Sequence, residues 1–171
     1  MAYDAAAIAN YFLDLADRDE TGLDPMKIQK IVYFGHGWHL ALKDEPLIKE
    51  RIEAWEYGPV IPPLYGQFKK FGNGPITERA VKMEYEALKF SYKVASIENQ
   101  GDEQTNASTR SLLDRIWVVY GGLSGIQLSN LTHADGSPWA ITIAKHPGQR
   151  HLVIDDALIK AEFKKMLPAE Q

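Results

Sequence analysis

Two histidines, His36 and His39, lie three positions apart, a spacing that places both imidazoles on one face of a helix. Imidazole nitrogens are common zinc ligands, so His133 and Asp135 from a later turn could complete the site of a metal-dependent hydrolase. The chain contains no HExxH sequence, and no carboxylate follows one turn later on the same helix. His39 also lies within an apolar stripe, where a hydrogen-bonded core histidine is the ordinary outcome. We therefore keep the hydrolase as an alternative and predict no metal and no cofactor.

Other catalytic chemistry finds little support in the sequence. The chain has no cysteine, which excludes disulfides, thiolate metal sites and cysteine nucleophiles. It contains no GxSxG, and residues 122–125 are better explained as a helix break followed by the N-cap Ser124. The phosphate-binding patterns GxxxxGK[ST] and GxGxxG are absent as well. These absences favour a binding protein, and we predict that the chain is not an enzyme.

An aromatic segment is the strongest candidate for binding. Residues 55–60 read WEYGPV, in which a Gly-Pro break directly follows two large aromatic residues. Burial in the core is the default for each ring alone, but as a unit the segment indicates an irregular, exposed corner of the kind that carries function. Aromatic residues dominate the energetics of protein interfaces. We predict that the following residues bind a partner: Trp55, Tyr57, Gly58, Pro59, Val60, Tyr65, Lys69, and Lys30 from the polar side of a preceding helix.

Composition and charge limit the classes of partner and the cellular compartment that we expect for this chain. The 171 residues are 45% hydrophobic and carry a net charge of −4, which suits one domain with a real core. An acidic balance provides no electrostatic footprint for nucleic acid. The N-terminus has no basic segment typical of a secretion signal, and no apolar run reaches the length of a membrane span. We expect a cytoplasmic protein whose partner is neither nucleic acid nor membrane.

Apolar periodicity and capping residues predict mostly helices. The segment 77–95 alternates apolar and polar residues, which favours strands, although its Glu, Lys and Ala residues are also good helix formers. The polar segment 97–108 is expected to be an exposed loop. Gly35, inside the apolar stripe of the second helix, suggests a close approach by another backbone. Helices are predicted at 5–17, 25–42, 109–121, after Pro62, after Ser124 and after Asp155, with short strands at 52–54 and 152–154.

These elements define the expected fold class. We predict a mainly α, compact single-domain helical fold with a small antiparallel β element, spanning residues 1–171. The sequence contains no internal repeat and no boundary between domains.

Four stretches resemble the Panacea antitoxin domain family, which includes SocA-like proteolytic adaptors and phage-associated GepA-type proteins. They are KIQKIVYFGHGWHLA, PLIKERIEAWEYGPVIPPLY, LSNLTHADGSPW and VIDDALIKAEF. The resemblance covers most of the chain and leaves out roughly 75–107, so this middle segment is divergent and its structure is open. Residues 75–107 could determine which partner the protein binds.

The resemblance implies a compact, mostly helical domain that acts by binding. Family members are antitoxins of toxin–antitoxin pairs, often in prophage or other mobile DNA, and neutralise a protein toxin that a neighbouring gene encodes. SocA-like members instead deliver the toxin to a protease. The leading hypothesis is thus an antitoxin that binds its toxin directly, with the proteolytic adaptor and the metal-dependent hydrolase as alternatives.

Overall fold

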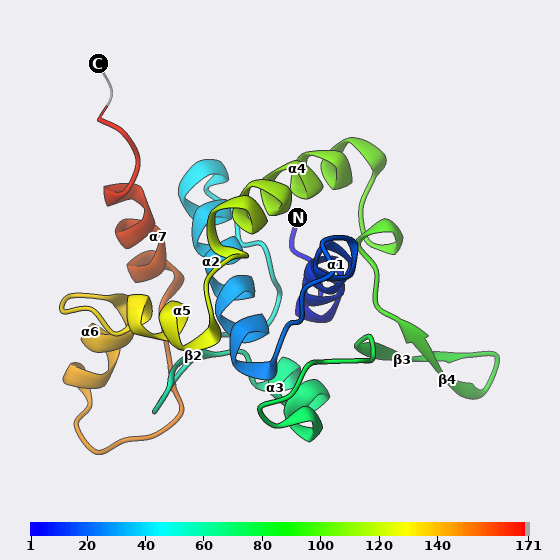
Figure 1. Cartoon of the computed structure of the whole chain (residues 1–171), viewed down its shortest axis with the longest axis horizontal. Helices are drawn as coiled ribbons and strands as arrows, with labels where there is room; N and C mark the ends of the chain where they lie inside the picture. The colour runs from blue at the N-terminus through cyan, green and yellow to red at the C-terminus, as the bar shows by residue number, and fades with distance from the viewer. Residues whose placement is uncertain (170–171) are drawn as a thin grey trace.

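The computed structural model describes residues 1–169, in which helices predominate (Figure 1). The α-helices are α1 (Ala5–Arg18), α2 (Pro25–Lys43), α3 (Pro62–Phe68), α4 (Glu103–Tyr120), α5 (Gly125–Thr132), α6 (Pro138–Lys145) and α7 (Asp156–Lys165). Two single-turn 3₁₀ helices, η1 (Lys69–Phe71) and η2 (Ile97–Asn99), complete the set. The mainly α fold class is confirmed. Within residues 1–169 no helix is both long and apolar enough to cross a membrane.

Two small antiparallel sheets accompany the helices. The first has the order β2-β1-β5 and consists of β1 (Glu53–Trp55), β2 (Gly58–Val60) and β5 (Leu152–Val153). Its central strand β1 pairs Trp55 with Gly58 and Ala54 with Leu152. The second is a two-stranded hairpin of β3 (Val81–Glu86) and β4 (Lys89–Val94). The first sheet thus joins a segment that follows α2 to a segment that precedes α7.

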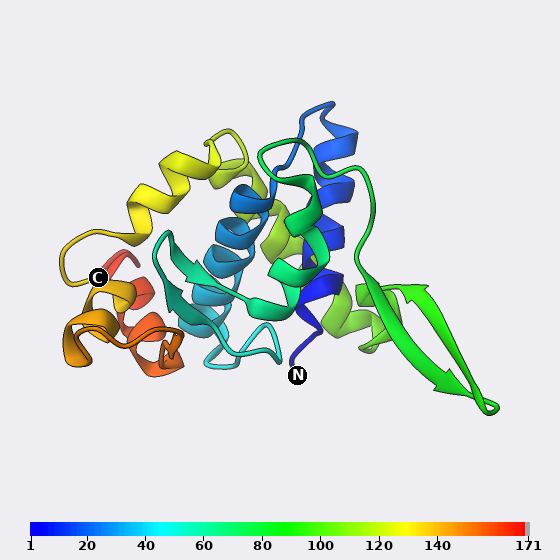
Figure 2. The same ribbon diagram turned by 90° about the horizontal axis from the view of Figure 1, so that it is seen from below.

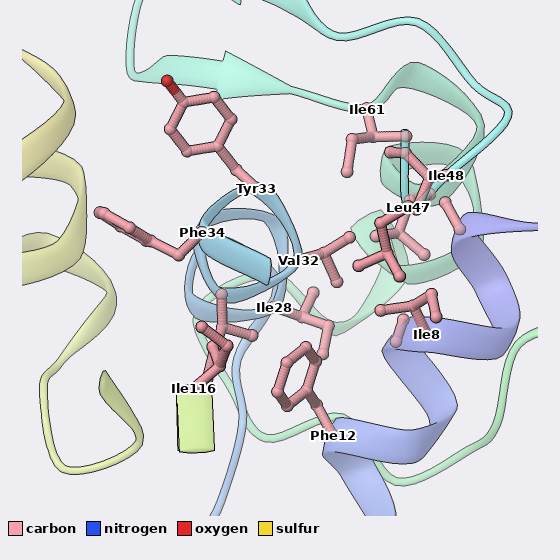
Figure 3. Packing of buried hydrophobic residues seen from close by; sticks show 14 of the residues in the cluster. Ile8, Phe12, Ile28, Val32, Tyr33, Phe34, Leu47, Ile48, Ile61 and Ile116 are labelled. Atoms are coloured by element: carbon pink, nitrogen blue, oxygen red, sulfur yellow. The ribbon is translucent and has the colours of Figure 1, made fainter. Parts of the chain in front are cut away.

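Helix α2 runs through the centre of the molecule, with the other helices arranged around it (Figure 1). Its buried residues occur all around the helix, so it has no solvent-facing stripe over most of its length. A view along its axis shows Val32, Tyr33 and Phe34 pointing in three directions, toward different neighbours (Figure 3). The helix begins where the sequence predicts, because the Asp24 side chain accepts a hydrogen bond from the Lys27 amide and Pro25 occupies the first turn.

The prediction of an exposed loop at 97–108 is wrong. Residues 97–99 form η2, and α4 begins at Glu103, six residues before its expected start. The Asp102 side chain caps α4 by accepting a hydrogen bond from the Thr105 amide at 2.8 Å. Asn106 is buried, where its side chain accepts a hydrogen bond from the Tyr3 hydroxyl. The first turns of α4 are polar because most of their residues face solvent. Their composition is therefore similar to that of an exposed loop.

The β3–β4 hairpin projects from the body of the protein (Figure 2). Its base is tied to α1 by the buried side chain of Asn10. The Asn10 amide nitrogen donates to the carbonyls of Ala80 and Ala95, and its oxygen accepts from the Ala80 amide. Of the two alternatives for 77–95, the strands are confirmed, and beyond the base most residues of the hairpin are exposed.

The close approach expected at Gly35 occurs instead at Gly37. A Cβ atom on Gly35 would meet side chains of Leu47 and Leu113 no nearer than 3.4 Å, which is ordinary van der Waals contact. A Cβ on Gly37 would lie 2.3 Å from a ring carbon of Phe163. Phe163 is buried, and its ring packs edge-on against Trp38, Tyr33 and Phe34. Gly37 is therefore the position that lets α7 pack against α2.

This geometry predicts opposite effects for two alanine substitutions on one helix. Gly37→Ala forces the Phe163 ring to move within a filled core, so we expect it to lower the free energy of unfolding by about 1–3 kcal/mol. Gly35→Ala is the matched control, because it gains up to about 1 kcal/mol of helix propensity with room for its methyl group. Urea unfolding followed by circular dichroism measures both variants. Equal stability of the two would contradict the packing described here.

Candidate partner-binding site

The aromatic segment predicted to bind a partner forms the tight β1–β2 hairpin, with Glu56 and Tyr57 at its tip. Both tip side chains are exposed, and Tyr57 retains 63% of its accessible surface. Gly58, the next residue, has a φ of +104°, which residues with a Cβ rarely adopt. A Cβ at this position would also lie 2.7 Å from Oγ1 of Thr132. Glycine is thus required both for the turn and for the contact with α5.

Side chains from three helices fix the backbone of this hairpin. Nζ of Lys30 on α2 donates to the Pro59 carbonyl at 2.9 Å. Ser129 on α5 donates its hydroxyl to the Tyr57 carbonyl at 2.9 Å. Nε1 of Trp139 on α6 donates to the Trp55 carbonyl at 2.7 Å. The three bonds are made to main-chain oxygens of β1, the turn and β2, so the hairpin backbone is anchored to all three helices.

The hairpin also forms one wall of a hollow of about 720 Å³. The ring of Trp55 stacks on His151, with centroids 4.7 Å apart, and meets Tyr65 edge-on at 5.1 Å. A concave, aromatic-lined surface of this volume is within the range of ligand and peptide sites. The lining residues come from the start of α2, the hairpin, α3, the segment after η1, α6 and the loop before β5: Pro25, Met26, Gln29, Lys30, Ala54, Trp55, Glu56, Tyr57, Val60, Tyr65, Gly72, Asn73, Ile143, Gln149, Arg150 and His151.

The structure brings five of the eight predicted binding residues together around this hollow, namely Lys30, Trp55, Tyr57, Val60 and Tyr65. Lys69 lies on η1, exposed and outside the lining. Gly58 and Pro59 do not line the hollow either, because they are buried against α2 and α5.

The exposed corner expected at residues 55–60 is only partly present. Glu56 and Tyr57 are exposed, whereas Gly58, Pro59 and Val60 are buried against α2 and α5. The Gly-Pro sequence indicates an irregular backbone correctly, but that backbone faces inward because β2 contacts both helices.

Lys30 does not lie on a polar side of its helix. Only 1% of its surface is accessible, since α2 is covered on all sides. Burial lowers the pKa of its ammonium group to about 8, because a low-dielectric environment disfavours the charged form. Lys30 is among the residues that line the hollow, while its ammonium group donates to the Pro59 carbonyl.

Sequence reasoning missed the loop that carries Gln149, Arg150 and His151. His151 has a φ of +55°, and its ring stacks on the Trp55 ring of the β1–β2 hairpin. The sequence does contain a signal, since a Pro-Gly pair at 147–148 precedes the predicted strand at 152–154. Only the pairing of β5 with β1 places this loop beside Trp55, and one sequence does not reveal which strands pair.

The structure does not assemble the histidines of the alternative hydrolase site. His36 contacts Asp156 at 2.9 Å and accepts from the amides of Leu47 and Ile48. His39 bonds to the Glu45 carbonyl, and His133 to the Ser129 carbonyl. Across residues 1–169 no three His, Cys, Asp or Glu side chains form a group that could hold a metal ion. Each histidine has a separate structural partner.

A second exposed surface lies on the β3–β4 hairpin. Its strand register places all apolar side chains on one face and charged or polar ones on the other. The apolar face is largely open to solvent, with Phe90 at 69% and Tyr92 at 71% exposure. Alternation within 77–95 predicts this segregation, but not that the apolar face is uncovered. The face consists of Val81, Met83, Tyr85, Phe90, Tyr92 and Val94.

Comparison with known proteins gives consistent results. Residues 28–140 match the model of the family described as "Antitoxin SocA-like, Panacea domain". The chain is also 34% identical over 164 residues to Antitoxin SocA of Caulobacter vibrioides (strain NA1000 / CB15N), covering 94% of this chain and 82% of that protein. No solved structure matches. The matched region includes α2 from Ile28 onward, the β1–β2 hairpin and most of the lining of the hollow.

Proposed function

The chain belongs to the SocA-like Panacea antitoxin family, and from this premise we propose that it neutralises a co-encoded protein toxin by direct binding. The toxin docks in the hollow beside the β1–β2 hairpin, where the exposed Tyr57 and Tyr65 rings and the half-buried Trp55 ring provide contact area. The observation that carries the proposal is that five residues selected from sequence as partner-binding line one concave surface.

Rigidity of the hollow supports the proposal. Association costs free energy whenever loops and side chains become ordered, and the hydrogen bonds from Lys30, Ser129 and Trp139 already hold the hairpin. Aromatic rings on a fixed backbone are the typical anchors of an interface. Neutralisation by this mode needs no reaction centre, which agrees with the separate structural partners of the three histidines.

Delivery of the toxin to a protease is the alternative within the same family. An adaptor would use the same surface for the toxin and would need a second surface for the protease. The exposed apolar face of the β3–β4 hairpin is a candidate for this second surface. The hairpin projects from the body of the protein, away from the β1–β2 hairpin (Figure 2). Co-expression distinguishes the two modes, as described below.

Tyr57→Ala tests the docking surface. The Tyr57 ring is exposed and its backbone is held by Ser129, so we expect the fold to remain intact. Loss of the ring should weaken toxin binding by at least about 1 kcal/mol, because it removes an aromatic contact from the interface. Isothermal titration calorimetry with the purified toxin measures the affinity, and thermal unfolding checks the fold.

The matched control is Tyr85→Ala on the β3–β4 hairpin, since Tyr85 is exposed to a similar extent, 57%. This variant should bind the toxin like the unmodified protein. Unchanged affinity for Tyr57→Ala, or a larger loss for Tyr85→Ala, would place the interface elsewhere.

Co-expression with the adjacent open reading frame tests the function itself. We expect the neighbouring gene alone to arrest growth, and this chain to restore growth while co-purifying with the neighbour's product in a stable complex. Direct binding explains both results, because a toxin held in a complex is present but inactive.

Other outcomes are equally clear. Rescue accompanied by loss of the neighbour's protein, and reversed in a protease-deficient host, would support the adaptor instead. A harmless neighbour that does not co-purify would contradict the pairing with that gene product.

A further inference from the structure

The apolar face of the β3–β4 hairpin is a surface that the chain itself leaves uncovered. An antiparallel sheet with one apolar and one polar face normally packs its apolar face on a core. A hairpin of two strands without such a layer is only marginally stable in water. Within residues 1–169, β3 and β4 pair only with each other, and all their residues except Val81 and Glu84 are exposed. The hairpin therefore lacks a layer over its apolar face.

The base of the hairpin fixes the direction in which it projects. From α1, the Asn10 side chain binds the main chain of Ala80 and Ala95. From α3, the Gln67 side chain donates to the Val81 carbonyl at 2.9 Å and accepts from the Val81 amide. Because two helices hold its base, the hairpin stands away from the body (Figure 2). A layer over its apolar face has to come from another molecule.

The two faces of the hairpin differ in what they still require. The charged face lies in water, and Lys93 on this face pairs with a carboxylate oxygen of Glu84 on the opposite strand at 2.7 Å. The apolar face has no charged side chain, and the hydroxyls of Tyr85 and Tyr92 are its only polar side-chain groups. The apolar face is thus the one that gains free energy from being covered.

The tip of the hairpin adds a further apolar side chain. Leu88 is 87% exposed and has a φ of +64°, next to Ala87 with a φ of +49°. Turns of this kind usually contain Asn and Gly, because a residue with a Cβ is strained in the left-handed region. Formation of the turn does not require a leucine. A large apolar side chain at this position contributes free energy only when an interface buries it.

The size of the apolar surface is close to what one half of a stable dimer needs. A standard protein interface buries about 800 Å² per partner. The exposed apolar side chains of the hairpin and its tip together present roughly 700 Å², if each large ring has a full area of about 150–250 Å². On a monomer, an uncovered apolar patch of this size marks an interaction site. The side chains counted are those of Met83, Tyr85, Leu88, Phe90, Tyr92 and Val94.

The chemistry of the face favours a second copy of the chain as its cover. Two identical faces related by a twofold axis are complementary when no like charges meet between them. All charged side chains of the strands lie on the other face, so the chain's net charge of −4 does not oppose this contact locally. The hydroxyls of Tyr85 and Tyr92 can both donate and accept hydrogen bonds, so each suits the same group on another copy.

We propose that the protein is a homodimer in which the apolar faces of two β3–β4 hairpins pack on each other. The two hairpins form two layers about 10 Å apart, the usual spacing of packed sheets. Since the hairpin projects away from the β1–β2 hairpin (Figure 2), the hollow of each copy stays open in the dimer. Dimerisation does not depend on a toxin, so the purified chain alone is sufficient for the test.

Sedimentation velocity over a range of protein concentrations measures the oligomeric state. We expect the unmodified protein to sediment with twice the mass of the 19.2 kDa chain. Tyr92→Lys should raise the dissociation constant of the dimer by at least about tenfold, because the interface would bury an unpaired ammonium group. The Tyr92 side chain is 71% exposed in the single chain, so thermal unfolding should show an intact fold.

Ser91→Lys is the matched control. Ser91 is the neighbouring residue on β4, is also exposed and lies on the polar face. The substitution adds the same charge to the same strand, but outside the proposed interface, so this variant should remain a dimer. Equal dissociation of the Tyr92→Lys and Ser91→Lys variants, or a dimer that persists in Tyr92→Lys, would overturn the proposal.

The unmodified protein provides a readout that does not depend on the folding of a variant. In an equal mixture of ¹³C-labelled and unlabelled chains, isotope-filtered NMR detects only contacts between different copies. We expect such contacts among the rings of Tyr85, Phe90 and Tyr92. Contacts between copies that involve only other parts of the chain would place the dimer interface elsewhere and overturn the proposal.

Other occupants of the face give different results. A chain that is monomeric at every concentration would overturn the proposal and leave the face for another protein, such as the protease that an adaptor needs. Protection of residues 81–94 only when the toxin is added would assign the face to the toxin and overturn the proposal as well. Loss of toxin binding in Tyr57→Ala with the dimer retained would agree with two separate surfaces.

Discussion

The structure depends on a helix, α2, that is buried along most of its length yet carries polar side chains. A buried polar group must be hydrogen-bonded, or it destabilises the fold. The polar residues of α2 meet this requirement by binding the main chain of the segments around it: Lys27 binds Gly121, Gln29 binds Ile61, Lys30 binds Pro59, His36 binds Leu47 and Ile48, and His39 binds Glu45. The helix is thus both the centre of the core and the anchor of its connections.

The candidate binding site follows from this arrangement. Gln29 and Lys30 fix the end of β2, and residues of α5 and α6 fix the turn and β1. The backbone that carries Trp55 and Tyr57 is consequently rigid, although these side chains lie at the rim of an open hollow. Such preorganisation favours binding, because little conformational freedom remains to be lost when a partner arrives. The same anchoring buries the ammonium group of Lys30 against the Pro59 carbonyl.

Much of the fold could be predicted from local sequence signals. Asp24 with Pro25 marks the start of α2, and Ser124 with Gln127 forms a capping box at α5, so both helices were expected where they occur. The burial of Lys30 could not be predicted, because a lysine indicates a solvent-facing side unless neighbouring elements are known to cover it. His151 joins the site only through the pairing of β5 with β1, and Gly37 is tight only because Phe163 of α7 packs on it. These features depend on contacts between distant segments, whereas capping depends on neighbouring residues.

Amide hydrogen exchange of the complex reveals whether the toxin occupies the hollow beside the β1–β2 hairpin. We expect toxin binding to slow exchange in residues 53–60 and 149–151, with little change across the β3–β4 hairpin. This hairpin has the other large exposed apolar surface described above, so it is the natural competing site. Slowed exchange confined to residues 81–94, with the hollow unaffected, would place the toxin on the β3–β4 hairpin instead.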